Sequence, residues 1–106
     1  MFTLSHPTPD APALLHAAGD LTIYEVQQAL EQLKALLPAA SDAAWQLDLS
    51  GIAELDSAGA QLLLALHQSL AAYGQQPEII AASPSVIELA GLLALDVLHP
   101  TAPAED

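Results

Sequence analysis

Apolar residues recur along this chain of 106 residues with two different spacings. Between Trp45 and Leu49 every second residue is apolar, which is typical of a β-strand with one buried face. From about Ser57 to Tyr73 apolar residues recur at spacings of three and four, which is typical of an amphipathic α-helix. We therefore expect a strand that leads through a tight turn into a helix. The apolar face of this helix is expected to carry Leu62, Leu63, Leu66, Leu70 and Tyr73.

Further strands and helices are expected on both sides of this pair. Three prolines make His6–Pro12 a poor place for a helix or a central strand, so we expect a loop there after a short first strand. Pro38 is expected to stop the first long helix, and Pro84 to begin the third. The other expected elements are a strand at Ala13–Ala17, a turn at Gly19 and Asp20, a helix from about Ile23 to Leu36, a strand at Glu78–Ala82, a helix through Leu92, an edge strand at Val97 and Leu98, and a frayed tail at Thr101–Asp106.

Strands that alternate with helices across short turns predict an α/β fold. We expect a mixed, mostly parallel sheet of four to five strands with three to four helices packed against it. The length suits one domain with one core. This domain is expected to span residues 1–106, with the core at 13–98, the first strand and the proline-rich loop in 1–12, and a flexible tail at 99–106.

The charge balance argues against several functions. Thirteen Asp and Glu residues stand against a single base, Lys34, so the formal net charge is -12. Nucleic-acid binding is excluded as a working hypothesis, because phosphate backbones are bound by clustered Lys and Arg. A nucleotide-hydrolysing enzyme is disfavoured for a similar reason. Any protein partner is expected to present a basic surface, with an association that weakens as the salt concentration rises.

The sequence predicts a cytoplasmic protein with no cofactor and no metal. Met1–Leu4 lacks the basic start and apolar core of a signal peptide, and no apolar run reaches the roughly 18 residues of a membrane span. The absence of cysteine removes disulfides and thiolate ligands. His6, His16, His67 and His99 are scattered, and none pairs with another at the spacing of a helical metal site.

The turn at Asp56–Gly59 lies between the expected strand and the leucine-rich helix. Ser57 is well suited to cap the first turn, because its hydroxyl can accept a hydrogen bond from a backbone N–H that has no partner within the helix. Gly59 allows a tight turn or close packing. The simplest interpretation of Ser57 is therefore a structural one, a capping serine.

The order of segments also resembles a known family. A short apolar run at Leu47–Ile52, the turn at Asp56–Gly59 and a leucine-rich helix follow one another as in the STAS domain, which bacterial anti-sigma factor antagonists share with the cytoplasmic ends of sulfate transporters. Gly19–Leu21 is similar to the Gly-Glu-Leu run before the first helix of that family. Residues 74–86 resemble its fourth strand and the turn into its third helix. The likeness covers about residues 13–98, and it implies a STAS-like fold and a non-enzymatic signalling domain.

The resemblance also implies functional residues. In the antagonist branch the serine directly after the aspartate is phosphorylated by the cognate anti-sigma kinase, and the matching residue here is Ser57. Ala58 stands where a second Ser or Thr is common, so Ser57 is the one acceptor in this loop. Ala60 stands where a bulkier Leu is usual, which alters the expected shape of the partner-docking helix start. The implied partner is an anti-sigma factor or a kinase. The implied partner-binding residues are Asp56, Ser57, Ala58, Gly59, Ala60, Gln61, Asp20 and Thr22.

Phosphorylation of Ser57 is expected to act as a charge switch. It would add roughly 1.5 to 2 negative charges and three acceptor oxygens beside Asp56. A helix N-terminus tolerates such an anion, so the fold is expected to survive while the docking surface changes. No large conformational change is needed.

Three alternatives remain open. The domain is also similar to the STAS subunit of phospholipid-trafficking ABC transporters, in which Ser57 would only contact the ATPase. The second alternative is a component of chemotaxis-type signalling, because the sequence is also similar to the small stand-alone STAS proteins of such systems. A serine hydrolase would need a histidine and an oxyanion hole beside Ser57, and the loop has no Gly-x-Ser-x-Gly turn. Asp48 and Asp56 are better explained as a strand-end residue and a turn former than as paired catalytic carboxylates.

Overall fold

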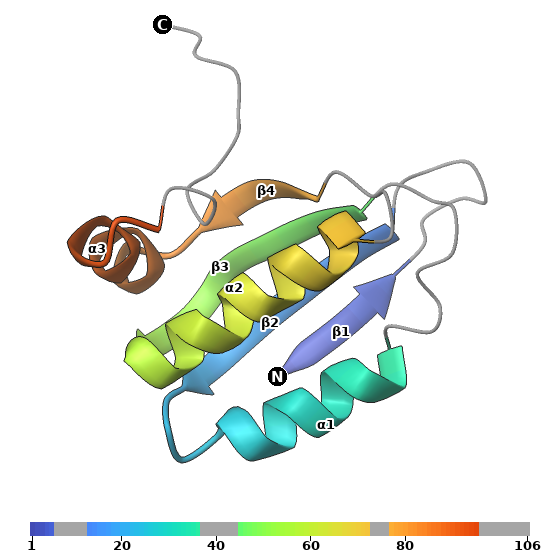
Figure 1. The fold of residues 1–106 in the computed structure, drawn as a ribbon, viewed down its shortest axis with the longest axis horizontal. Helices are drawn as coiled ribbons and strands as arrows, with labels where there is room; N and C mark the ends of the chain where they lie inside the picture. Colours follow the sequence, from blue (N-terminus) through green and yellow to red (C-terminus); the bar gives the residue numbers. More distant parts are fainter. Residues whose placement is uncertain (6–12, 37–44, 73–76, 96–106) are drawn as a thin grey trace, which may run out of the picture.

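The computed structural model describes residues 1–5, 13–36, 45–72 and 77–95. Strands and helices alternate along most of this part of the chain (Figure 1). Their bounds are β1 Phe2–Ser5, β2 Ala13–Leu21, α1 Val26–Leu36, β3 Trp45–Leu55, α2 Ser57–Ala72, β4 Glu78–Ala82 and α3 Pro84–Leu92.

The four described strands form one mixed sheet in the order β1-β2-β3-β4. β1 is antiparallel to β2, whereas β2 and β3, and β3 and β4, are parallel. Among the described elements, α1 connects β2 to β3, α2 connects β3 to β4, and α3 follows β4. The expected α/β fold with a mostly parallel sheet is therefore confirmed. No helix in the described ranges is both long enough and apolar enough to cross a membrane.

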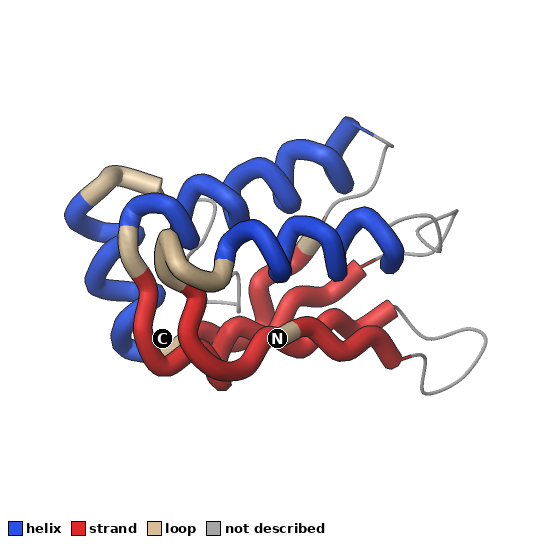
Figure 2. Tube along the Cα trace, turned by 90° about the horizontal axis from the view of Figure 1, so that it is seen from below, coloured by secondary structure: helices blue, strands red, loops and turns tan. Residues whose placement is uncertain are grey.

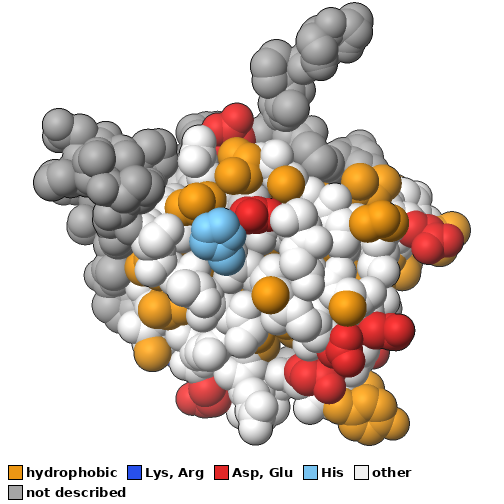
Figure 3. All heavy atoms as spheres, turned by 180° about the vertical axis from the view of Figure 1, so that it is seen from behind, with side chains coloured by type: hydrophobic (Ala, Val, Ile, Leu, Met, Phe, Trp, Pro, Cys, Tyr) orange, Lys and Arg blue, Asp and Glu red, His pale blue; other side chains and the backbone are white. Residues whose placement is uncertain are grey.

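The helices α1 and α2 lie over the same face of the sheet (Figure 2). The core fills the space between these helices and the sheet. It is built from the inward-facing residues of β2 and β3 and from the apolar faces of the helices. Trp45, at 1% exposure, is part of this core, as its position on an apolar strand predicts. The opposite face of the sheet shows carboxylates and no lysine or arginine among the described residues (Figure 3).

The central strands are longer than the sequence predicts. β2 continues through the expected turn at Gly19 and Asp20 to Leu21, and β3 continues beyond Leu49 to Leu55. Pairing between the two parallel strands extends to Leu21 opposite Leu55, with two register shifts on the way. The prediction of a turn at Gly19 and Asp20 was wrong, because hydrogen bonds to the neighbouring strand outweigh the local tendency of glycine to form a turn. The φ of Gly19, 102°, is accommodated within the strand.

The helix starts differ from the sequence-based expectation at one place. α1 begins at Val26 rather than Ile23, because Thr22–Glu25 forms a turn in which the Thr22 carbonyl accepts from the N–H groups of Glu25 and Val26. The starts of α2 at Ser57 and α3 at Pro84, and the bounds of β4, are confirmed.

Several expectations fall outside the described residues. These are the loop at His6–Pro12, Tyr73 at the end of the second helix, the edge strand at Val97 and Leu98, and the tail at 99–106. The assignment of residues 1–106 to one domain stays a prediction.

Candidate functional site

The junction between β3 and α2 exposes the hydroxyl of Ser57. β3 ends at Leu55, and Ser57 is the first residue of α2. Ser57 is solvent-exposed, and its hydroxyl has no hydrogen-bond partner among the described residues. Another molecule can therefore reach this oxygen from solvent.

Asp56, and not Ser57, caps α2. The N–H of Gly59 donates to Asp56 Oδ1 at 3.0 Å, and the N–H of Ala60 donates to the Asp56 carbonyl at 2.9 Å. This is the geometry of an N-cap residue, with the side chain bonded to the third helical N–H. The expected capping role of Ser57 is thus wrong, because the helix begins one residue earlier than a serine cap would require. The capping carboxylate leaves the serine hydroxyl without a structural task.

The second carboxylate oxygen of Asp56 binds a distant segment. The N–H of Ile23 donates to Asp56 Oδ2 at 2.8 Å, across 33 positions of sequence. These bonds, first from Gly59 and then from Ile23, hold the pKa of Asp56 below its usual range, so the carboxylate is charged at neutral pH. Asp56 therefore joins the start of α2 to the turn that precedes α1.

Gly59 permits the close approach of α2 to the end of β2. A Cβ at this position would lie 2.1 Å from the Leu21 carbonyl oxygen and 2.8 Å from Leu55 Cδ1. Ala60 is also buried, at 0% exposure. The structure thus places Gly59 and Ala60 in the interior, and the surface at this point is formed by Asp56, Ser57, Ala58 and Gln61.

The turn Thr22–Glu25 carries two exposed apolar side chains. Ile23 is 60% exposed and Tyr24 is 89% exposed. The turn is held by its own hydrogen bonds, since Glu25 Oε1 accepts from both the N–H and the hydroxyl of Thr22. The Thr22 hydroxyl bond is the largest cause that lowers the pKa of Glu25. Thr-x-x-Glu is a capping-box spacing, so the sequence itself contains a signal for this turn.

A groove between α1 and α2 starts beside Ser57. It has a volume of about 340 Å³. Ala58 and Gln61, two of the predicted site residues, lie in its wall. The other lining residues are Ile23, Val26, Gln27, Leu30 and Leu62. Leu62, expected in the core, is half-buried because it faces this groove.

The remaining predicted site residue is Asp20, and two further titratable groups lie on the central strands. Asp20 is exposed near the end of β2. His16 Nδ1 and Asp48 Oδ2 lie 3.1 Å apart. Asp48 lies within β3 rather than at a strand end, and the hydroxyl of Ser50 is the main cause that lowers its pKa. The part of the chain that the structure describes contains no group of three His, Cys, Asp or Glu residues that could hold a metal ion.

Sequence comparison identifies the family of this fold. A family model described as "Mlab, STAS domain" matches residues 5–100. The chain belongs to the STAS domain family. None of the curated proteins matches this STAS domain significantly.

Solved structures share the fold of this STAS domain. The anti-sigma factor antagonist SpoIIAA in its unphosphorylated form superposes with a TM-score of 0.65 at 18% identity, over 90% of this chain and 82% of its own. The Bacillus cell fate determinant SpoIIAA in the phosphorylated form gives a TM-score of 0.66 at 18% identity, over 99% and 94%. An uncharacterized protein from Shewanella loihica PV-4 with a SpoIIAA-like fold gives 0.52 at 16% identity, over 92% and 79%.

Proposed function

We propose that this protein is a cytoplasmic, non-enzymatic signalling domain that binds a partner protein at the start of α2, and that phosphorylation of Ser57 releases the partner. The observation that carries the proposal is the exposed Ser57 hydroxyl at the first position of α2. Among the described residues it makes no hydrogen bond that phosphorylation would break. The partner is an anti-sigma factor or a kinase. Bacillus SpoIIAA, which shares the fold, has been solved in a phosphorylated form.

The docking surface consists of the α2 start, the α1–α2 groove and the turn Thr22–Glu25. Ile23 and Tyr24 supply exposed apolar area beside the groove. Apolar patches with a polar rim are typical of protein-binding sites. Asp56, Ser57, Ala58 and Gln61 form the part nearest the serine, with Asp20 and Thr22 at its border, while buried Gly59 and Ala60 give it shape rather than contact.

Phosphorylation changes the surface and spares the fold. A phosphate on Ser57 adds roughly 1.5 to 2 negative charges next to the ionised Asp56. The helix dipole accepts an anion at this end, and the cap stays intact because Asp56 makes it. A partner that fits the bare hydroxyl would meet added bulk and concentrated negative charge.

The partner is expected to present a basic surface. The chain has 13 acidic residues and one base, so a second acidic protein would be repelled. Attraction of this kind speeds association and weakens with salt.

Substitution of Ser57 tests the proposal. The partner is first recovered from the native cell and identified by mass spectrometry. We expect Ser57→Asp to stay folded by circular dichroism and to lose the partner, and Ser57→Ala to keep it and to take up no phosphate from the cognate kinase. Gln68→Glu is the matched control, because it adds the same charge to an exposed position farther along α2. Normal binding by Ser57→Asp, or equal loss in Gln68→Glu, would contradict the proposal.

A second candidate function is supported by the matching family model. Its description names Mlab, and a STAS subunit of a phospholipid-trafficking ABC transporter would use the same surface to hold an ATPase. Stable co-purification with an ATPase, with no phosphoserine at position 57 in protein from the native cell, would favour this function. A chemotaxis-type signalling role would instead be indicated by co-purification with components of such a system.

A further inference from the structure

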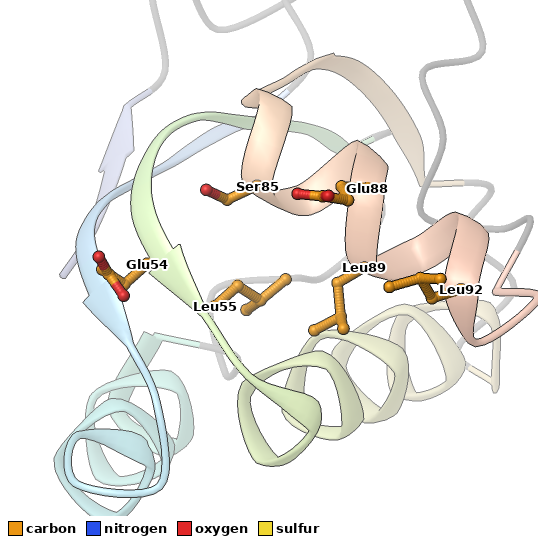
Figure 4. Close-up of a pocket in the computed structure, with 6 residues that line it drawn as sticks. All are labelled: Glu54, Leu55, Ser85, Glu88, Leu89 and Leu92. Carbon is orange, nitrogen blue, oxygen red and sulfur yellow. The ribbon is translucent and has the colours of Figure 1, made fainter.

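A second hollow lies on the other side of the α2 start, between the end of β3 and α3. It has a volume of about 170 Å³. Four of its lining residues share one face of α3, at spacings of three and four, and two come from β3 (Figure 4). The residues are Glu54, Leu55, Ser85, Glu88, Leu89 and Leu92.

The hollow combines an aliphatic wall with two free carboxylates. Leu92 is 76% exposed and forms the outer part of this wall. Within the described part of the chain, neither Glu54 nor Glu88 has a hydrogen-bond or ion-pair partner. The Ser85 hydroxyl is engaged, because it donates to the Ala53 carbonyl at 2.8 Å. The groups left to bind a ligand are therefore the two carboxylates and the leucines.

We infer that this hollow receives an arginine or lysine side chain of the partner protein. Such a side chain has an aliphatic stem that packs on apolar surface and a cationic head that binds carboxylates. The stem is matched by Leu55, Leu89 and Leu92, and the head by the carboxylates of Glu88 and Glu54, which lie on opposite sides of the hollow (Figure 4). The inference rests on the proposed function in one respect, since it takes the ligand to be a protein.

The charges of this chain exclude other occupants. A second copy would offer a single base, Lys34, on a chain of net charge -12. Residues 96–106 contain no Lys or Arg and include three acids, so this segment does not complement two carboxylates. Nucleic acids and anionic membranes would be repelled. A different protein with a basic surface remains.

The hollow and the α1–α2 groove flank the residue that the proposed function assigns to control. Leu55 lines the hollow, Ala58 lines the groove, and Ser57 lies between them in sequence. One partner can therefore contact both, with the cationic side chain as an anchor that does not touch Ser57.

A capped amino acid tests the hollow without the partner. Nα-acetyl-arginine N-methylamide is titrated into the full-length ¹⁵N-labelled protein at low salt, beside the citrulline analogue, which has the same shape and no charge. We expect saturable NMR shifts confined to the lining residues with the arginine probe and none with the citrulline probe. Glu54→Gln and Glu88→Gln should each weaken binding about two- to fivefold, as for a partly exposed ion pair.

The matched control is Glu31→Gln, which removes an exposed acid from α1. Equal weakening in this variant, shifts at acids all over the surface without saturation, or binding of the citrulline probe would overturn the inference. Ser57→Asp is expected to bind the arginine probe as wild type does. If the probe fails while Ser57→Asp still releases the partner, only the inference falls. If the probe binds while the partner ignores position 57, only the proposed function falls.

Discussion

Replacement of Gly59 by alanine gives the sharpest test of how α2 is placed. The new Cβ would lie 2.1 Å from the backbone oxygen of Leu21, whereas ordinary contact begins near 3.4 Å. The shortfall is 1.3 Å (3.4 minus 2.1), and the obstacle is backbone rather than a side chain that can rotate away. The start of α2 must therefore move away from the end of β2, and Ser57 moves with it.

Two opposing effects set the size of the change. Alanine is better than glycine in a helix by about 1 kcal/mol. Overpacking of this kind costs about 1–3 kcal/mol and occasionally more, and here it also strains the hydrogen bond between Gly59 and Asp56. We expect a net loss of about 1–2 kcal/mol, which lowers the Tm by about 4–8 °C per kcal/mol in a domain of this size.

Gly91→Ala is the control for this prediction. Gly91 lies in α3, and a Cβ there meets no atom within 4 Å. The same chemical change should raise stability by a few tenths to about 1 kcal/mol. Urea unfolding can be followed by the fluorescence of Trp45, the single tryptophan, which is buried in the core. If Gly59→Ala stabilises the protein as Gly91→Ala does, α2 does not approach β2 as closely as described.

The remaining predictions concern the Asp56 cap, the open sheet face and the core. Asp56→Ala should cost about 1–2 kcal/mol, since it removes a helix cap. The folded pKa of Asp56 is lowered, so its charged form stabilises the protein above the unfolded pKa, and this stability is lost as the pH falls through the folded pKa. Asp56→Asn should therefore lose less stability on acidification below pH ~4 than wild type, and equal losses in urea unfolding at several pH values would argue against this role. Ser50→Ala should raise the pKa of Asp48 more than His16→Ala does in an NMR titration, because the serine bond is the larger cause; the reverse order would contradict it. Leu63→Ala should cost about 2–5 kcal/mol in the same urea assay, as expected for a fully buried leucine, and a loss below about 1 kcal/mol would place Leu63 outside the core.

Local pattern was sufficient for the type of each described element and for the buried face of β3. Trp45, Leu47 and Leu49 alternate, and each is buried. The starts of α2 and α3 were also predicted, because a turn residue followed by a helical apolar period, or a proline in the first turn, acts within a few residues. Signals of this range are complete in the sequence itself.

The tertiary structure decided which groups meet across the chain. The bond between Ile23 and Asp56, the contact of Gly59 with Leu21, and the hollow between β3 and α3 each join segments that are far apart in sequence. β2 extends beyond its predicted end for the same reason, because the residues that pair with its last part lie on β3.

Sequence by itself therefore determined the α/β architecture, the acidic character and the position of Ser57 at a helix start. Only the tertiary structure brought the Asp56 carboxylate to the N–H of Ile23, across 33 positions of sequence, and placed the α1–α2 groove beside Ser57. The physical reason is that periodicity and charge belong to each segment, whereas hydrogen bonds and cavities between segments exist only once the helices have packed on the sheet.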